Sequence, residues 1–278
     1  MKVKLGCDVK IALAQLSSTD DVATNLDSIL KIVDEIMGAD PLVSLIVFPE
    51  NTLYFRIVAA EKVVAIDLQS EVWSALQKKA QQKKVNLHLT TAILDTDKKV
   101  YNASVLIREN GLVEVLYRKV HLFDMALSGQ SPIRESDSFE RGSVASVFQI
   151  GDFKFGSSIC YDLRFAELYA SYAAQEVDAI LVPAAFLVKT GQAHWEVLLR
   201  ARAIESQCFV LAPAQVGTHR SVRSEDQRET FGHTLGIGPW GEILTLKAEG
   251  VGFVIVELSQ QTLKAVRTQI PMKSHRRL

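Results

Sequence analysis

Three ionisable side chains of different types each stand at or just after an apolar run of the chain. Glu50 follows SLIVFP, Lys119 stands near the end of LVEVLYRKV, and Cys160 follows FKFGSSI. Apolar runs of this kind are typical of buried strands, and ligand sites in open α/β sheets lie beyond the carboxyl ends of the strands. The pattern therefore predicts that the three side chains share one site.

Together the three side chain types could attack a carbonyl group. A thiol becomes a good nucleophile only as a thiolate, which requires a base or a nearby cation. A carboxylate such as Glu50 can accept the thiol proton, and an ammonium group such as Lys119 can stabilise a thiolate and an oxyanion. A helix starting shortly after Cys160 would add backbone N–H groups and the positive end of its dipole.

Each of these residues also has a purely structural explanation. A single cysteine on an apolar strand is usually a small buried hydrophobic residue, and this is what we expect for Cys208 and Cys7. A glutamate after proline is commonly a turn residue, and a lysine at a strand end is commonly a solvated edge charge. Only the surrounding sequence separates the two explanations.

The elements that would position these residues alternate between strands and helices. Apolar runs predict strands at residues 10–16, 44–48, 85–94, 101–107, 112–120, 148–150, 153–159, 179–182, 208–214, 234–238, 241–246 and 252–258. Helical spacing predicts helices through residues 26–37, 70–83, 165–175, 193–205 and 260–268, the first of them stopped by Gly38 and Pro41. Glu109, Asn110 and Gly111 predict a hairpin turn, whereas the polar stretches 128–146 and 217–230 predict loops.

Composition narrows the class of protein. The 278 residues are 48% hydrophobic and carry a net charge of −1, which favours one α/β domain spanning residues 1–278 and argues against binding to nucleic acid or to a membrane surface. Charges interrupt every apolar run before the roughly 18 residues that a membrane span needs, and the N-terminus has no secretory pattern. Cys7, Cys160 and Cys208 form neither a disulfide framework nor a metal-binding pair, which indicates the reducing cytoplasm.

The motifs around the three residues resemble those of the carbon–nitrogen hydrolase (nitrilase) superfamily. Its Glu–Lys–Cys triad matches Glu50 in VFPEN, Lys119 in YRKVHLFD and Cys160 in SICYDLRFAEL. The segments PAAF, TGQAHWEVLLRARAIESQCFVLAPAQVG, FGHT, PWGEI and SHRRL resemble the Nit branch, which is also found fused to Fhit domains. Two positions depart from the pattern: Ala166 stands where the family usually has proline, and residues 217–230 are longer than the usual connection.

The resemblance implies a fold and an assembly. We expect an α/β fold built as a four-layer αββα sandwich, with two sheets face to face and helices outside. Homologues pair through helices, so we expect a homodimer or a higher homo-oligomer whose interface includes the helix over residues 165–175 and the C-terminal tail.

The resemblance also implies a reaction and a mechanism. Glu50 would be the general base and later the general acid, Cys160 the nucleophile that forms a thioester, and Lys119 with the backbone N–H of Tyr161 the oxyanion donors. A second glutamate assists in the superfamily, and Glu135 matches it rather than Glu140. Neither a metal nor an organic cofactor is required, and the histidines show no HxH or HExxH zinc pattern.

The substrate implied by the resemblance is deaminated glutathione, a small anionic amide, which would give 2-oxoglutarate and cysteinylglycine. An ω-amidase acting on 2-oxoglutaramate and an N-carbamoyl amidase are alternatives within the same reaction class. A non-catalytic interaction scaffold that retains the fold is an alternative from another class.

Six positions are predicted to contact the substrate: Tyr161, Arg164, Ala184, Ala185, Phe186 and His194. An anionic substrate needs cationic or amide partners, and Arg164 could supply one, although it could equally serve a structural ion pair. His194, Trp195 and Glu196 match the family's HWE run. We expect them at a helix start, forming a wall of the site and supporting Glu50 or the loop before it.

Overall fold

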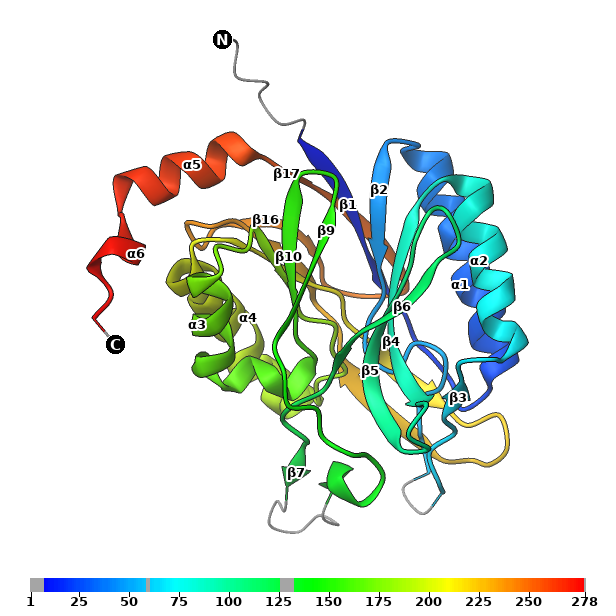
Figure 1. The fold of residues 1–278 in the computed structure, drawn as a ribbon. Coiled ribbons are helices and arrows are strands. Elements are labelled where there is room, and N and C mark those ends of the chain that lie inside the picture. Colours follow the sequence, from blue (N-terminus) through cyan, green and yellow to red (C-terminus); the bar gives the residue numbers. More distant parts are fainter. Residues whose placement is uncertain (1–7, 59–60, 126–132, 278) are drawn as a thin grey trace.

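Two mixed β-sheets lie face to face with helices on both outer sides (Figure 1). The computed structural model describes residues 8–58, 61–125 and 133–277. Helices α1 and α2 cover one outer face, and α3 and α4 cover the other, as the same figure shows. The expected αββα arrangement is therefore confirmed. No helix of the described ranges is long and apolar enough to cross a bilayer.

The first sheet has the strand order β17-β1-β2-β4-β5-β6, with the short β3 paired to β4. Its central strands β1, β2 and β4 run parallel, and β17, β5 and β6 pair antiparallel to their neighbours. The bounds are β1 Val9–Gln15, β2 Val43–Val47, β3 Ile66–Asp67, β4 Asn86–Leu94, β5 Val100–Ile107, β6 Val113–Arg118 and β17 Gly252–Leu258. The predicted hairpin turn between β5 and β6 is present, with Gly111 at a φ of 88°.

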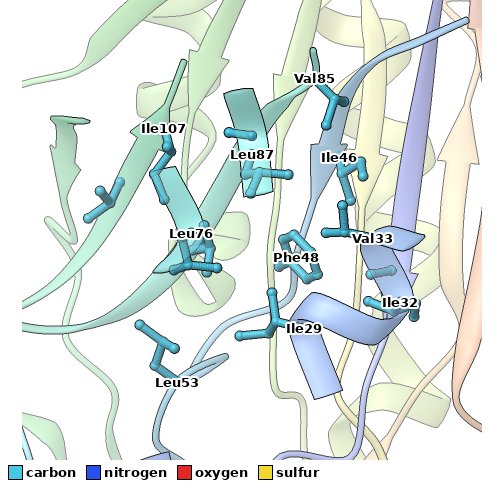
Figure 2. Packing of buried hydrophobic residues seen from close by; sticks show 14 of the residues in the cluster. Ile29, Ile32, Val33, Ile46, Phe48, Leu53, Leu76, Val85, Leu87 and Ile107 are labelled. Atoms are coloured by element: carbon cyan, nitrogen blue, oxygen red, sulfur yellow. The ribbon is translucent and has the colours of Figure 1, made fainter. Parts of the chain in front are cut away.

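Helices α1 (Val22–Ala39) and α2 (Glu71–Lys83) pack on the outer face of this sheet. Asp21 begins α1 because its carboxylate accepts the Thr24 N–H at 2.8 Å. Figure 2 shows Ile29 and Val33 of this helix packed toward the apolar side chains of the sheet. The helix continues through Gly38, beyond the predicted stop.

The second sheet has the order β16-β15-β12-β11-β10-β9 and carries α3 and α4 on its outer face. Strands β10, β11 and β12 run parallel, and the remaining pairs are antiparallel. The bounds are β9 Ser146–Ile150, β10 Phe153–Ser157, β11 Ala179–Leu181, β12 Phe209–Ala212, β15 Thr234–Ile237, β16 Ile243–Lys247, α3 Ala166–Ala174 and α4 Val188–Ser206. Between β10 and α3 lies a short 3₁₀ helix, η2, Cys160–Arg164.

The space between the sheets is filled by alternate side chains of their strands. Along β1, Ile11 and Leu13 point into this central core, whereas Ala12 and Ala14 face α1 and α2. Phe155 of β10 belongs to the same central core from the opposite side. Because both faces of β1 are buried there, its central residues Ile11–Ala14 are continuously apolar rather than alternating.

The polar stretch 217–230, predicted to be a loop, is a β-hairpin, so that prediction was wrong. Strands β13 (Val216–Arg220) and β14 (Gln227–Phe231) pair antiparallel over five positions. The buried His219 holds the hairpin, because its ring nitrogens lie 2.7 Å from the Ser18 carbonyl and 2.7 Å from the Thr230 hydroxyl. These anchors are polar, which is why the apolar pattern did not reveal the strands.

Several smaller features also differ from the sequence expectations. Helix α4 begins five residues earlier than expected, at Val188. The other stretch predicted to be a loop, residues 128–146, contains β8 (Ile133–Arg134) and a 3₁₀ turn, η1, Glu135–Asp137. Strand β8 pairs with β7 (Asp124–Met125). The tail forms α5 (Gln260–Gln269) and the unexpected α6 (Met272–His275). Residues 128–132 and Cys7 lie outside the described residues.

Candidate active site

Glu50, Lys119, Cys160 and Glu135 line one pocket at the ends of strands from both sheets. Glu50 lies just beyond β2 and Lys119 directly after β6, both in the first sheet, whereas Cys160 follows β10 of the second sheet. Facing sheets therefore bring together side chains that are 69 and 41 positions apart in the chain. The shared site predicted from strand ends is thus assembled across the sandwich rather than along one sheet.

Lys119 lies between two carboxylates and is only 2% exposed. Its ammonium nitrogen is 2.9 Å from Glu50 Oε1 and 2.8 Å from Glu135 Oε2. Burial disfavours the charged amine, but the charges of Glu135 and Glu50 outweigh it and raise the pKa of Lys119 well above its ordinary value. Lys119 is therefore a permanent cation at the pocket floor.

Both oxygens of the Glu50 carboxylate are held in place. Asn102 of β5 donates its Nδ2 to Oε1 at 2.8 Å, and the backbone N–H of Ala185 donates to Oε2 at 3.1 Å. Gln215 fixes the backbone of Glu50 through a 2.9 Å bond to its carbonyl. These bonds aim the carboxylate into the pocket, where it can exchange a proton with a reacting group.

Glu135 is fixed by the same kind of contacts. It accepts hydrogen bonds from Lys119, from Asn102 at 2.9 Å and from the Phe123 N–H at 2.7 Å. Glu140, the alternative weighed from the sequence, instead forms a half-exposed pair with Lys99 at 3.6 Å. Asn102 was missed by the sequence reasoning because it lies inside an apolar strand, and a buried amide in such a run is the signal that could have revealed it.

Cys160 adopts a left-handed backbone conformation, with a φ of 47°. A side chain other than glycine in this region costs of order 1–3 kcal/mol, so the surroundings must hold it. The Cys160 N–H donates to Pro183 O at 2.9 Å, and the fully buried Asp162 accepts the Ile159 N–H at 2.9 Å and the Tyr117 hydroxyl at 2.8 Å. Asp162, also missed by the sequence reasoning, is thus the anchor of the segment that carries the thiol.

The surroundings keep the Cys160 thiol protonated. Burial and the negative charge of Glu50 raise the pKa of the thiol well above its ordinary value, although Lys119 and the Ala185 N–H act in the opposite direction. At neutral pH the resting group is therefore the thiol, and forming a thiolate requires a proton acceptor. Glu50 is the carboxylate placed to act on it.

The predicted substrate contacts divide into two groups. Tyr161, Arg164, Ala185 and Phe186 line the pocket. Ala184 is fully buried and donates its N–H to Pro213 O at 3.0 Å, so it does not face the pocket.

Arg164 has no carboxylate within 4 Å among the described residues, so the alternative of a structural ion pair is not seen. Its guanidinium stacks over Tyr161 and Phe186, 5.8 and 5.5 Å from the ring centroids. His194 lies outside the pocket lining, and its Nδ1 is 3.2 Å from an Arg164 nitrogen. His194 therefore contacts a pocket residue rather than the pocket itself.

The HWE run lies beyond the first turn of α4 and not at its start. Trp195 donates its ring N–H to His233 O at 2.8 Å and packs on Phe186 at a centroid distance of 4.7 Å. Glu196 pairs with Arg200 on the surface of the helix. The expected support of Glu50 by this run is therefore wrong, because Asn102, Lys119 and Ala185 provide it.

Two cationic residues of the pocket escaped the sequence reasoning altogether. Arg56 follows the Glu50 segment, and Arg228 lies on β14 of the hairpin. Arg228 lies in a stretch predicted to be a loop, which is why it did not stand out, and no motif marked Arg56. A pair of arginines beside a nucleophile gives the pocket a strongly cationic wall.

Other reactive groups lie away from the pocket. Cys208 is fully buried, and burial raises the pKa of its thiol to about 12. Cys7 is outside the described residues. In the ranges that the structure covers, no group of three or more His, Cys, Asp or Glu side chains could hold a metal ion.

Comparison with known proteins gives the same family as the motifs. The model of the family described as carbon-nitrogen hydrolase matches residues 10–268. The deaminated glutathione amidase of Yersinia enterocolitica is 33% identical, covering 97% of this chain and 93% of its own, and that of Synechocystis sp. is 36% identical, covering 95% and 97%. The crystal structure of Saccharomyces cerevisiae Nit3, a member of branch 10 of the nitrilase superfamily, superposes with a TM-score of 0.84 at 28% identity, covering 100% of this chain and 99% of that one. The chain therefore belongs to the carbon–nitrogen hydrolase (nitrilase) family, in its Nit branch, and is an amidase.

Proposed function

We propose that this amidase hydrolyses deaminated glutathione to 2-oxoglutarate and cysteinylglycine through a thioester on Cys160. The observation that carries the proposal is the charged Lys119 fixed between Glu50 and Glu135 in the pocket that also holds the protonated thiol. This arrangement supplies a nucleophile, a proton acceptor and a fixed cation. The two relatives named above support the choice of substrate. Arg164, which has no carboxylate within 4 Å among the described residues, supports an anionic substrate.

The first half of the reaction forms the acyl-enzyme. Glu50 accepts the thiol proton while Cys160 Sγ bonds to the amide carbonyl carbon, and the carbonyl π electrons move to oxygen. The Lys119 ammonium and the Tyr161 N–H stabilise this oxyanion. When the oxyanion collapses, the C–N bond breaks, Glu50 returns its proton to the departing nitrogen, and cysteinylglycine leaves.

The second half releases the acid. Glu50 takes a proton from a water molecule as the water oxygen bonds to the thioester carbonyl. The new oxyanion occupies the same donors, and its collapse breaks the C–S bond. The Cys160 sulfur regains the proton from Glu50, 2-oxoglutarate departs, and the resting thiol is restored.

Glu135 acts through Lys119 in this scheme. It holds the ammonium from the side opposite Glu50, and its bonds to Asn102 and Phe123 keep it in place. The cation therefore stays in position when Glu50 becomes neutral during each proton transfer. Because Glu135 touches neither the thiol nor the carbonyl in this scheme, it is a positioning residue.

A panel of substrates with Cys160→Ala as the comparison tests the proposal. We expect the highest kcat/KM on deaminated glutathione and no turnover by Cys160→Ala, with an unchanged melting temperature because alanine meets the same backbone conformation. A higher kcat/KM on 2-oxoglutaramate or on an N-carbamoyl amino acid would replace the proposed substrate. Retained activity in Cys160→Ala would overturn the mechanism.

Labelling separates the enzyme from a non-catalytic scaffold. An electrophile such as iodoacetamide should modify Cys160 near neutral pH faster than Cys7 or Cys208, measured on the separate cysteine peptides. A Cys160 that reacts no faster than the buried Cys208 would favour the scaffold.

We also propose that residues 1–278 form one domain that assembles as a cytoplasmic homodimer or higher oligomer. The central core joins both sheets, which supports the single domain. The tail lies along α3 and α4, with Arg276 donating to Glu205 O at 2.7 Å and Lys273 paired with Glu176, so the two predicted interface segments form one continuous surface. Light scattering would show the assembly, and the need for a free thiol at Cys160 favours a reducing compartment.

A further inference from the structure

Arg56 and Arg228 line the catalytic pocket without a carboxylate partner. Among the described residues, no Asp or Glu oxygen lies within 4 Å of either guanidinium group. Arg56 donates to the Ser138 hydroxyl at 3.0 Å, and Arg228 donates to the backbone carbonyl of Arg56 at 3.3 Å. Both cations therefore have only neutral partners.

In the described part of the chain, the positive charges of these two guanidinium groups are not balanced by a nearby carboxylate. Burial and the positive charge of Arg56 lower the pKa of Arg228, while Glu50, Cys160 and Glu135 act in the opposite direction. Both side chains are half-buried, so each guanidinium loses part of its hydration, and neutral hydrogen-bond partners compensate this loss only in part. An anionic group that enters the pocket would complete this pair.

The position of Arg228 is built by the hairpin. Phe55 stacks on the ring of His219 at a centroid distance of 4.1 Å, and the Arg228 guanidinium lies 5.4 Å from the centroid of the same phenyl ring. Because His219 is anchored at both nitrogens, the hairpin cannot shift freely and Arg228 is held beside Arg56. Rigid placement of this kind lowers the entropic cost of binding a ligand.

Arg164 is held by a different set of residues. Its guanidinium lies over the rings of Tyr161 and Phe186 and beside His194, whereas Arg228 lies over Phe55 and Arg56 donates to Ser138. The pocket therefore offers two separate cationic positions beside one nucleophile.

We propose that Arg56 and Arg228 form a carboxylate-binding subsite distinct from Arg164, so that the substrate carries a carboxylate on each side of the scissile amide. This inference rests on the proposed function and deepens it. Guanidinium groups bind carboxylates with paired, charge-assisted hydrogen bonds. Deaminated glutathione has such a pair of carboxylates, one on its 2-oxo acid end and one on its glycine, whereas 2-oxoglutaramate has only the first.

Three probes test the assignment: deaminated glutathione, its analogue with the glycine carboxylate capped as an amide, and its analogue whose acyl group is 4-oxopentanoyl, in which a methyl group replaces the carboxylate and the oxo group is kept. For the wild type we expect each missing carboxylate to lower kcat/KM about 10- to 100-fold, as for a charge-assisted hydrogen bond. In the double variant Arg56→Gln/Arg228→Gln, the fold loss in kcat/KM caused by removing one of the two carboxylates should fall to nearly 1. In Arg164→Gln, the fold loss caused by removing the other carboxylate should fall to nearly 1.

Two results would overturn the subsite. One is that the double variant loses the same factor on all three probes. The other is that the double variant and Arg164→Gln both abolish the fold loss in kcat/KM for the same carboxylate. Arg220→Gln is the matched control, because Arg220 lies on the same hairpin and its exposed side chain donates a hydrogen bond to Gln227. We expect it to behave as the wild type, and thermal unfolding of every variant checks that the hairpin is intact.

Alkylation separates this inference from the choice of substrate. Iodoacetate and iodoacetamide are similar in size, but only iodoacetate is charged. At Cys160, the alkylation rate with iodoacetate divided by the rate with iodoacetamide should fall several-fold in the double variant and stay constant in Arg220→Gln. If the wild type turns over none of the three probes and this ratio still falls, the proposed substrate fails and the anion subsite stands, whereas an unchanged ratio overturns the subsite.

Discussion

The two halves of the active site are held by different means. On the side of the first sheet, Glu50, Lys119 and Glu135 fix one another through charged side chains, with Asn102 bridging the two carboxylates. On the side of the second sheet, Cys160 has a left-handed backbone conformation that the surrounding hydrogen bonds must hold.

The nucleophile side depends on a single buried carboxylate. Asp162 binds the backbone N–H groups of Ile159 and His121 and the Tyr117 hydroxyl. The base side therefore depends on charge compensation between side chains, whereas the nucleophile side depends on how a loop is tied down. Substitutions should disturb electrostatics on the first side and geometry on the second.

Among the variants that keep the thiol, Glu50→Gln should give the largest change in activity. We expect kcat to fall about 10²- to 10⁴-fold, because the proton acceptor is gone. Since the charge of Glu50 raises the pKa of Cys160, the pH profile of iodoacetamide labelling should shift to lower pH in the same variant. A matched control is Glu140→Gln, which removes a half-exposed carboxylate and should change neither measurement. Parallel losses of turnover and labelling would mean that Glu50 holds geometry rather than a proton.

Lys119→Met should cause the largest loss of stability on the base side. It leaves Glu50 and Glu135 buried without their cation, and breaking a buried pair costs about 3–5 kcal/mol. Urea unfolding at neutral pH would measure this loss. Lys10→Met breaks a partly exposed pair with Asp40 and should cost less. Equal losses for the two variants would contradict charge compensation at the base.

Asp162→Asn tests the nucleophile side. The amide keeps the shape but turns an N–H₂ toward donors such as the Ile159 N–H, so we expect a loss of about 2 kcal/mol in the free energy of unfolding. Labelling of Cys160 should slow, because the loop that carries the thiol loosens. The exposed Asp152→Asn, at the turn between β9 and β10, should change neither. An unchanged labelling rate in Asp162→Asn would show that the cysteine conformation does not depend on this anchor.

The smallest effect concerns the interface between the two sheets, where His88 of β4 stacks on Phe148 of β9 at 6.1 Å. Neither of its ring nitrogens has a partner within the part of the chain that the structure covers, and burial lowers the pKa of His88 from 6.5 to about 3. The unfolded chain therefore binds the proton more readily, so stability falls as pH drops from 6.5 toward 3. At pH 5 the cost is about 2 kcal/mol.

His88→Leu should remove this acid sensitivity, which urea unfolding at pH 7 and pH 5 would measure. Exposed His275→Leu should keep the wild-type slope with pH. If His88→Leu has the same slope as the wild type, the acid sensitivity comes from other groups.

Much of the fold followed from local patterns. Apolar runs and helical spacing predicted most strands of both sheets and most helices, and the motif resemblance predicted the αββα order of layers. Boundaries were less predictable: α4 begins at Val188 and α1 continues through Gly38, because tertiary packing outweighs local breaking signals there.

The sequence by itself determined which residues are candidates for the chemistry. Glu50, Lys119 and Cys160 were recognisable because reactive types follow apolar runs and match family motifs, whereas Glu135 was recognisable only from its match to the family. These signals are local, a few residues long, and independent of how the strands are arranged.

Only the tertiary structure decided what surrounds those residues. Asn102 and Asp162 are polar anchors inside apolar segments, and their role depends on groups from other strands. Arg228 reaches the pocket on a hairpin held by His219 and Phe55, contacts that no local pattern encodes. The physical reason is that these buried polar groups form hydrogen bonds with partners distant in the chain, and those partners are known only once the sheets are packed.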